Sequence, residues 1–328
     1  MLLGWGAAMT EALYGTGGFY RRETPSSHFR TSVHASPLYA AALAGLAARV
    51  DAALGHPDRF DLVDVGAGRG ELLAGVAAAV PAGLRDRLRP VGVEVAQRPA
   101  DLPAGTGWQA TVPPLTGLLL ANEWLDNVPV DVVELTADGP RQVLVDSTGT
   151  ESLGPPPDRA ALDWLAAWWP LTEPDARAEV GLARDAAWAA AVGQVRRGVA
   201  VAMDYSHDRA ARAAGAVGGG TLSAYRDGRS VRPVPDGTCD LTAHVALDAC
   251  AATAAHLADG TLLTDQRTAL RALGVHGRRP DRALAAADPA SYLAALVSAG
   301  AAAELTDPAG LGGFGWLLQS VGVPLPLC

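Results

Sequence analysis

The sequence predicts an α/β protein built on a doubly wound, Rossmann-like sheet. An apolar strand at 61–66 runs directly into three alternating glycines, and an Ala/Leu-rich helical segment follows. A second apolar segment at 90–95 ends near an acidic residue, and a third at 115–121 ends in a polar loop. Strand, tight glycine turn, helix and second strand are the parts from which doubly wound sheets are built.

The glycine turn from Asp64 to Gly70 is the most informative part of the chain. Gly66, Gly68 and Gly70 permit positive φ and leave no Cβ to block a ligand, and the free N–H groups of the next helix face that ligand. The spacing is one residue tighter than the dinucleotide pattern, and Asp64 would repel a pyrophosphate but accept from an ammonium. The turn therefore favours an amino-acid ligand such as S-adenosyl-L-methionine over NAD; an ordinary turn is the alternative.

Glu94 ends the second strand at the position where doubly wound folds bind a ribose. That acid lies about 20 residues beyond the glycine turn and accepts from the ribose hydroxyls. We expect Glu94 to bind ribose, with a plain surface carboxylate as the alternative.

Composition limits the classes of function. The 328 residues suit one large domain or a core with an inserted subdomain. A net charge of −9 argues against nucleic acid and is compatible with a cationic substrate. Three cysteines, without CxxC spacing, predict neither a zinc site nor a disulfide framework. We find no signal peptide and no transmembrane run, so we expect a cytoplasmic protein that does not insert into a membrane.

The chain divides into four expected regions. Residues 1–36 are expected as an irregular N-terminal segment over the cofactor site, and 37–135 as the ligand-binding core, opening with a helix at 37–54 that Ser36 caps. Residues 136–197 are expected as a mainly helical insertion, and 198–328 return to the core with a second, mainly helical insertion near 206–300.

Particular elements are expected within these regions. The expected elements are a hairpin of strands 130–135 and 141–146 around Asp138-Gly139, helices at 158–169 and 174–197, and strands at 198–205, 301–305 and 314–321. The stop signals for the second helix are arginines in its last turn and Gly198 just beyond it.

A second polar constellation follows the third strand, in Ala121 to Val130. Asn122 and Asn127 are the only asparagines in the chain, and Glu123 and Asp126 lie between them. Ligands in such sheets bind outside the carboxyl ends of the strands, so this loop is expected beside the glycine turn. The alternative is an ordinary polar loop with asparagine turn chemistry.

Motifs spread along nearly the whole chain resemble the MidA family of class I S-adenosylmethionine-dependent methyltransferases. The matching segments are Gly18-Phe19-Tyr20, Thr31-Ser32 with Ala35-Ser36, Asp64 to Gly70, Glu94, Asn122-Glu123, Asp126 to Pro129, Asp204-Tyr205, and Asp240 to Val245. The chain departs from the family where Asp64 replaces Glu, Val33-His34 replaces Pro-Glu, Trp124-Leu125 replaces two phenylalanines and Ser206 replaces Gly. The resemblance implies a class I methyltransferase fold with S-adenosyl-L-methionine as cofactor.

The resemblance and the chemistry together suggest roles for the site residues. We expect Glu123, Asp126 and His244 to be catalytic, the carboxylates polarising and deprotonating a guanidinium. We expect the cofactor to contact Thr31, Ser32 and Asn122 in addition to the glycine turn and Glu94, and the substrate to contact Tyr20, His34, Asp204 and Tyr205. A structural histidine, core tyrosines and plain turn capping are the alternatives for His244, the tyrosines and the Thr31-Ser32 pair.

The resemblance implies methyl transfer to an arginine of a protein, a respiratory complex I subunit in the family's mitochondrial members. Two other hypotheses stay open: methylation of a small molecule or peptide natural product, and a cofactor-binding assembly chaperone with little turnover. Fold does not fix the acceptor. The sequence also leaves a homodimer open.

Overall fold

A central seven-stranded sheet organises the molecule. The computed structural model describes residues 1–22 and 32–327. The strand order is β14-β15-β10-β5-β2-β3-β4. Its strands are β2 (Phe60–Val65), β3 (Leu88–Val93), β4 (Gly107–Gln109), β5 (Leu115–Asn122), β10 (Val195–Asp204), β14 (Gly260–Asp265) and β15 (Gly315–Val321). The five strands from β10 to β4 are parallel, whereas β15 is antiparallel to both of its neighbours. The predicted α/β, doubly wound class is confirmed.

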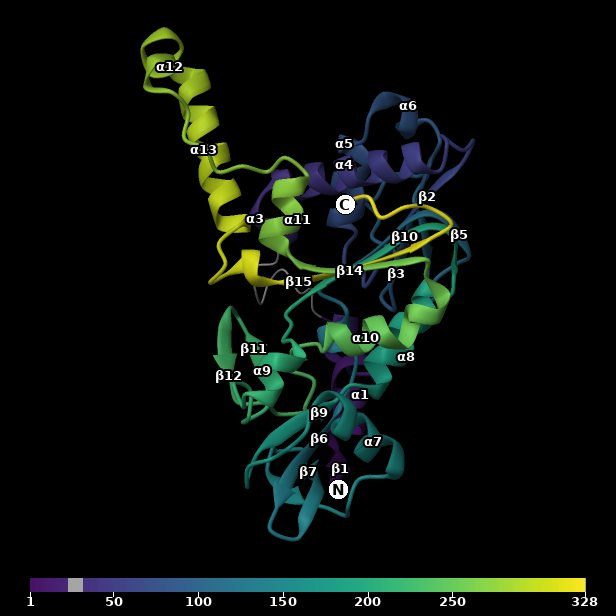
Figure 1. Ribbon diagram of the computed structural model, residues 1–328, viewed down its shortest axis with the longest axis vertical. Helices are drawn as coiled ribbons and strands as arrows, with labels where there is room; N and C mark the ends of the chain where they lie inside the picture. The colour runs from purple at the N-terminus through teal and green to yellow at the C-terminus, as the bar shows by residue number, and fades with distance from the viewer. Residues whose placement is uncertain (23–31, 328) are drawn as a thin grey trace.

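Helices cover both faces of this sheet because its strands are apolar on both sides. All six residues of β2 are buried. Leu62 packs with α4 (Pro37–Ala53) and α5 (Glu71–Ala79), whereas Val63 packs with α8 (Leu182–Val192) and α10 (Leu247–Ala254). In Figure 1, α4 and α5 lie above the sheet, and α8 and α10 lie below it. The alternation of side chains along each strand therefore divides the core into two layers.

The helix expected at 37–54 is confirmed. Ser36 has extended dihedrals, and its hydroxyl accepts a hydrogen bond of 3.1 Å from the amide of Leu38. Pro37 occupies the first turn, where its missing N–H leaves no hydrogen bond unmade.

A smaller, five-stranded sheet lies beside the N-terminal helices, at the end of the molecule that carries the N-terminus (Figure 1). Its strands are β1 (Leu3–Gly4), β6 (Asp131–Thr136), β7 (Gly139–Val145), β8 (Glu151–Leu153) and β9 (Arg177–Val180). The predicted hairpin is confirmed as β6 and β7. The helices near it are α1 (Trp5–Tyr14), α2 (Phe19–Arg22) and α7 (Arg159–Trp168), and α7 confirms the helix expected at 158–169. The segment expected to be mainly helical thus carries a sheet as well.

The single helix expected at 174–197 is wrong. The segment contains β9, which pairs with β6, and then α8, and β10 already begins at Val195. Two signals were misread. Ala178 and Val180, two residues apart, pack into one apolar cluster as residues on one face of a strand do. Gly198 does not end a helix; it lies inside β10 with φ of 134°, where a Cβ would be 1.9 Å from the carbonyl oxygen of Gly117. A close approach of two strands, not a cap, requires this glycine.

The strand expected at 301–305 is also wrong, because these residues end the long helix α13 (Pro289–Leu305). The strand that pairs with β15 is β14, which lies in a region expected to be helical. Alanine-rich segments favour a helix, whereas β14 alternates exposed and half-buried residues with too few apolar side chains to be recognised. The last expected strand, at 314–321, is confirmed as β15.

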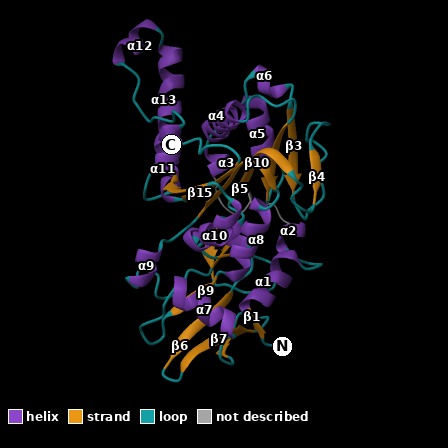
Figure 2. Ribbon diagram, turned by 45° about the vertical axis from the view of Figure 1, so that its right-hand side comes forward, coloured by secondary structure: helices purple, strands orange, loops and turns teal. Residues whose placement is uncertain are grey.

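The remaining helices and strands are distributed along the chain. They are α3 (Ser32–Ala35), α6 (Ala82–Arg85), α9 (Arg209–Ala213), α11 (Gln266–Ala272) and α12 (Arg282–Ala287), and a three-stranded sheet of β11 (Ser223–Arg226), β12 (Arg229–Val231) and β13 (Asp240–Thr242). Figure 2 shows α12 and the first turns of α13 extending away from the rest of the fold. Within the described residues, no helix combines the length and apolarity that crossing a membrane requires.

Candidate active site

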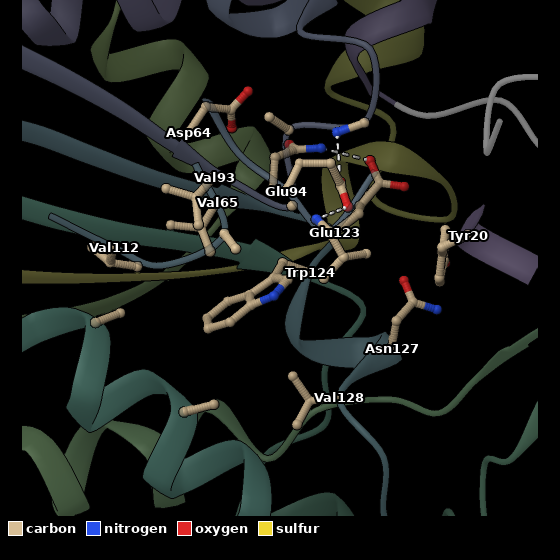
Figure 3. Close-up of a pocket in the computed structure, with 18 of the residues that line it drawn as sticks. Tyr20, Asp64, Val65, Val93, Glu94, Val112, Glu123, Trp124, Asn127 and Val128 are labelled. Atoms are coloured by element: carbon tan, nitrogen blue, oxygen red, sulfur yellow. Dashed lines mark hydrogen bonds between the residues drawn. The ribbon is translucent and has the colours of Figure 1, made fainter. Parts of the chain in front are cut away.

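A cavity of about 630 Å³ opens at the carboxyl ends of β2, β3 and β5. Strands β3 and β4 lie to one side of β2, and β5 and β10 lie to the other. The order in which the parallel strands are added to the sheet therefore reverses beside this cavity, as at the ligand-binding switch point of doubly wound folds. Figure 3 shows Val112 at one end of the cavity and Tyr20 at the other. We call these the cofactor end, lined by the glycine turn, Glu94, residues 110–112 and α8, and the acceptor end, lined by Tyr14, Tyr20, Glu123, Asn127, Val128 and Pro129.

The glycine turn between β2 and α5 has the backbone that the sequence predicts. Gly66, Gly68 and Gly70 have φ values of 70°, 54° and 79°. A Cβ on Gly66 would be 3.0 Å from Trp124, and one on Gly70 would be 2.9 Å from Leu102, whereas the space at Gly68 is open. Gly66 and Gly68 line the cavity and Gly70 lies behind it. Only glycine adopts such dihedrals without strain and also admits a ligand at the turn.

Glu94 joins the glycine turn to the end of β3. One carboxylate oxygen accepts from the amide of Gly68 at 3.0 Å, and the other accepts from Val95 at 2.6 Å and from Ala96 at 3.3 Å. Dashed lines in Figure 3 mark hydrogen bonds to the Glu94 carboxylate. A carboxylate oxygen has two lone pairs, so Glu94 retains the capacity to accept from a ligand hydroxyl.

Asp64 contributes a buried carboxyl group to the same end of the cavity. The residue is 2% exposed, and its side chain makes no hydrogen bond within the described part of the chain. Burial, reinforced by the nearby charges of Glu94 and Glu71, raises the pKa of Asp64 to about 8. A buried carboxyl without a donor costs free energy unless it is neutral or meets a cation. The position therefore suits a ligand ammonium.

Asn122 and Glu123 end β5 and form a linked pair in the middle of the cavity. Asn122 accepts from the Tyr39 hydroxyl at 2.6 Å and donates to Glu123 Oε1 at 3.1 Å. The amide of Ser32, from α3, donates to the same Glu123 oxygen at 3.3 Å. Glu123 has φ of 50°, uncommon for a side-chain-bearing residue and frequent at functional sites.

The second oxygen of Glu123, Oε2, is buried and has no hydrogen-bond partner among the described residues. Burial, and then the charge of Asp126, raises the pKa of Glu123 to about 8. Glu123 is therefore a carboxyl group poised to take up or release a proton near neutral pH.

The loop after Glu123 contains the short 3-10 helix η2 (Leu125–Asn127). A set of buried polar residues holds this loop in place. Asp204 accepts from the amides of Leu125 at 2.9 Å and Asp126 at 3.1 Å. The guanidinium of Arg184, on α8, donates to the carbonyls of Asp126, Val128, Ala243 and His244. Thr242 donates to the Asp126 side chain at 2.8 Å. Asp204 and Asp126, the latter part of the loop itself, are buried and do not line the cavity.

The two tyrosines of the acceptor end come from the N-terminal segment. Tyr14 and Tyr20 stack with ring centroids 5.6 Å apart. The Tyr20 hydroxyl donates to Asp240 at 2.8 Å, and the Tyr14 hydroxyl donates to the carbonyl of Asn127 at 3.1 Å. Both hydroxyl protons are thus engaged by the protein.

The structure brings some of the residues that the sequence singled out into the cavity lining and places others outside it. The cavity is lined by Tyr20, Asp64, Gly66, Gly68, Glu94, Asn122 and Glu123. Ser32 is buried beside Glu123. Tyr205 and His244 stack on each other with centroids 5.7 Å apart, away from the cavity lining. Thr31 lies outside the described residues, as does the side chain of His34.

Sequence reasoning gave no role to several residues that build the site. Tyr39, Arg184, Asp240 and Asn127 orient the loop or line the cavity. Asn127 carried a signal, as one of only two asparagines, and Asp240 carried another, as the first residue of a family-like motif. Arg184 carried none, because an arginine on an amphipathic helix is usually solvated.

The sheet order, the glycine turn and the ribose-type acid together define a protein that binds an adenosine-containing cofactor. A family model described as "Putative S-adenosyl-L-methionine-dependent methyltransferase" matches residues 42–263. The chain belongs to this family, whose cofactor is S-adenosyl-L-methionine.

Two solved structures from Burkholderia thailandensis are similar over almost the whole chain. One, a "likely methyl transferase" bound to S-adenosyl-homocysteine, is 25% identical with a TM-score of 0.81, covering 99% of this chain and 90% of that one. The other, an uncharacterised protein solved in its native form, is 25% identical with a TM-score of 0.79, covering 99% and 89%. No curated protein matches.

Proposed function

We propose that this protein transfers a methyl group from S-adenosyl-L-methionine to an arginine side chain of a protein, as its resemblance to the MidA family implies. The observation that supports an arginine acceptor is Glu123: a buried carboxyl group at the centre of the cavity, with one oxygen unpartnered in the described structure. A respiratory complex I subunit is the acceptor that the family resemblance favours.

The residues at the cofactor end fit S-adenosyl-L-methionine. Asp64 would accept from its ammonium, Glu94 from its ribose hydroxyls, and the amides of the glycine turn would face its carboxylate. The adenine would lie against the small side chains of Ala187, Ala190 and Ala191 on α8. When bound, this cofactor supplies an electrophilic methyl group on a sulfonium. The fit rests on an unpaired buried carboxyl and open space at Gly68.

Glu123 would then act on the acceptor. A protonated guanidinium has no free lone pair, so its nitrogen has to lose a proton as the new bond to carbon forms. The raised pKa of Glu123 suits a group that accepts this proton, and general-base catalysis of this kind contributes roughly 10²–10⁴-fold. Asn122 and the amide of Ser32 would hold the carboxyl in place through its other oxygen.

Four residues for which we expected catalysis or substrate binding do not line the cavity: Asp126, Asp204, Tyr205 and His244. Asp126 and Asp204 are buried and do not line the cavity, so we propose that they position Glu123 rather than contact the acceptor. Tyr205 and His244 lie outside the cavity lining, and we propose no direct part for them in methyl transfer.

The test is radiolabelled methyl transfer into an extract of a strain that lacks the protein. Purified protein and methyl-labelled S-adenosyl-L-methionine are incubated with the extract, and the labelled protein fraction is hydrolysed and analysed for methylated amino acids. We expect methylarginine with the native protein and none with Glu123→Gln. Label in small molecules alone would favour the metabolite hypothesis, and cofactor binding without transfer would favour the assembly chaperone.

A further inference from the structure

Asn127 is the polar group of the acceptor end that neither the cofactor nor the proposed base accounts for. It is 6% exposed and yet lines the cavity. Burying a side-chain amide is costly unless both its NH₂ group and its oxygen are hydrogen-bonded. The partners of these two groups therefore have to be identified.

The surroundings of Asn127 decide how its amide points. Its side-chain nitrogen lies 3.1 Å from Asp240 Oδ1 and 3.2 Å from the carbonyl oxygen of Leu241. Both partners are acceptors, so the amide group that faces them has to be the NH₂. The amide oxygen consequently points away from Asp240 and has no partner among the described residues. Figure 3 shows this side chain beside Tyr20 at the acceptor end.

Asp240 fixes this orientation and also holds Tyr20. The same Oδ1 atom accepts from the Tyr20 hydroxyl at 2.8 Å, and Asp240 is itself 1% exposed. Asp240 starts β13, whose next residues hold Asp126 and the loop backbone. The motif from Asp240 to Val245, in which the sequence gave a role to His244 alone, therefore sets the chemistry of the acceptor end through Asp240.

The acceptor end consequently presents acceptors and aromatic rings but few donors. Both tyrosine hydroxyl protons are engaged by the protein, and the amides of Glu123, Asn127 and Val128 donate to main-chain carbonyls. Pro129 has no N–H. In Figure 3 the indole of Trp124 lies toward the cofactor end. What faces an incoming group is the Glu123 carboxyl, the Asn127 amide oxygen and two stacked rings.

We infer that Asn127 is a specificity-determining residue, held by Asp240 as an acceptor, which selects a donor-rich cationic nitrogen group over carboxylates, phosphates and neutral isosteres. The inference rests on the proposed function and deepens it. A guanidinium has five N–H donors and no acceptor, and its cation is attracted to aromatic faces. An anionic or acceptor-rich group would instead face the Asn127 amide oxygen and, when Glu123 is ionised, a carboxylate of like charge.

The experiment measures binding of two matched probes to the protein saturated with S-adenosyl-homocysteine. N-acetyl-arginine methylamide is the cation, and N-acetyl-citrulline methylamide is its neutral isostere. For the native protein we expect the arginine probe to bind at least about 10-fold more tightly, since hydrogen bonds to charged groups are the stronger ones. For Asn127→Ala we expect affinity for the arginine probe to fall about 10-fold or more, and S-adenosyl-homocysteine affinity to stay within about twofold.

Tyr20→Phe is the second variant, because it keeps the ring and removes only the hydrogen bond to Asp240. We expect a smaller loss for the arginine probe than with Asn127→Ala. Equal binding of the two probes to the native protein, or arginine binding unchanged in Asn127→Ala, would overturn the inference. Failure of S-adenosyl-homocysteine itself to bind would instead contradict the proposed function, which separates the two failures.

Discussion

The cofactor end of the cavity comes largely from one continuous stretch of chain, whereas the acceptor end joins segments that are far apart. Asp64, the glycine turn and Glu94 lie within about 30 residues. At the acceptor end, by contrast, Tyr20 bonds Asp240 across 220 positions, and Asn127 bonds it across 113. The first end is fixed by backbone geometry and the second by buried side-chain contacts. The two ends should therefore respond differently to substitution.

The largest effect is expected at Glu123, between the two ends. Glu123→Gln keeps the size of the side chain and removes the base, so kcat should fall about 10²–10⁴-fold. Calorimetry should show cofactor affinity within about twofold of native, because the glycine turn is untouched. A variant with native kcat would remove Glu123 from the chemistry.

The pH dependence of kcat provides a second test at the same residue. Because the pKa of Glu123 is raised to about 8, the group is mostly protonated at pH 7 and becomes an effective base as pH rises. We therefore expect kcat of the native protein to rise between pH 7 and pH 9. The residual kcat of Glu123→Gln should not rise with pH in this range. A rise of the same shape in the variant would assign the titration to another group.

Arg184→Met tests whether buried contacts hold the acceptor end. Four carbonyl oxygens would each lose a hydrogen bond from the guanidinium, and we expect the free energy of unfolding to fall by about 3 kcal/mol or more. Arg196, exposed on β10, gives a matched control in Arg196→Met, which should change stability by less than about 0.5 kcal/mol. Denaturant unfolding measures both, and equal effects would show that Arg184 contributes no more than a surface arginine.

Asp64 gives the cofactor end a pH dependence of stability. Its pKa is about 8 in the folded protein against an ordinary value of 3.8, so the folded state binds the proton more tightly. This contribution is complete below about pH 3.8 and is lost as pH rises through about 8. We expect the cofactor-free protein to lose stability between about pH 4 and pH 8, and Asp64→Asn to show a flatter profile. Parallel profiles would contradict the raised pKa.

The smallest effect is expected at the N-cap of α4, which does not itself line the cavity. Ser36→Ala removes the hydroxyl that caps α4 and should lower the free energy of unfolding by about 1 kcal/mol. Cofactor affinity measured by calorimetry should be unchanged. A large loss of affinity would mean that α4 shapes the cavity more directly than its contacts indicate.

The same contrast explains what the sequence could predict. The glycine turn, Glu94 and the loop after β5 are local patterns, and their physical reasons can be read from consecutive residues. The contacts of Asp240 with Tyr20 and Asn127 arise only when β13 and α2 meet, and no spacing rule encodes that meeting. The segment 174–197 was misread for a related reason, since pairing of β9 with β6 outweighed its helical signals.

Tyr205 and His244 show the limit of sequence motifs in predicting the residues of the site. Both belong to family-like motifs, and both flank residues that matter: Tyr205 follows Asp204, and His244 follows the segment that braces the loop. A motif shows that a segment is constrained without showing which of its residues faces the ligand. That distinction requires the three-dimensional structure.

The most direct test of the account is calorimetric titration of S-adenosyl-L-methionine into the native protein, Gly68→Val and Gly45→Val. Gly68 has positive φ and faces open space at the cavity, whereas Gly45 is exposed in α4 with open space around it. We predict one-site binding to the native protein, little change in Gly45→Val, and a loss of at least about 100-fold, or roughly 2.7 kcal/mol, in Gly68→Val. No binding by the native protein, or unchanged affinity in Gly68→Val, would contradict the assignment of the cofactor end.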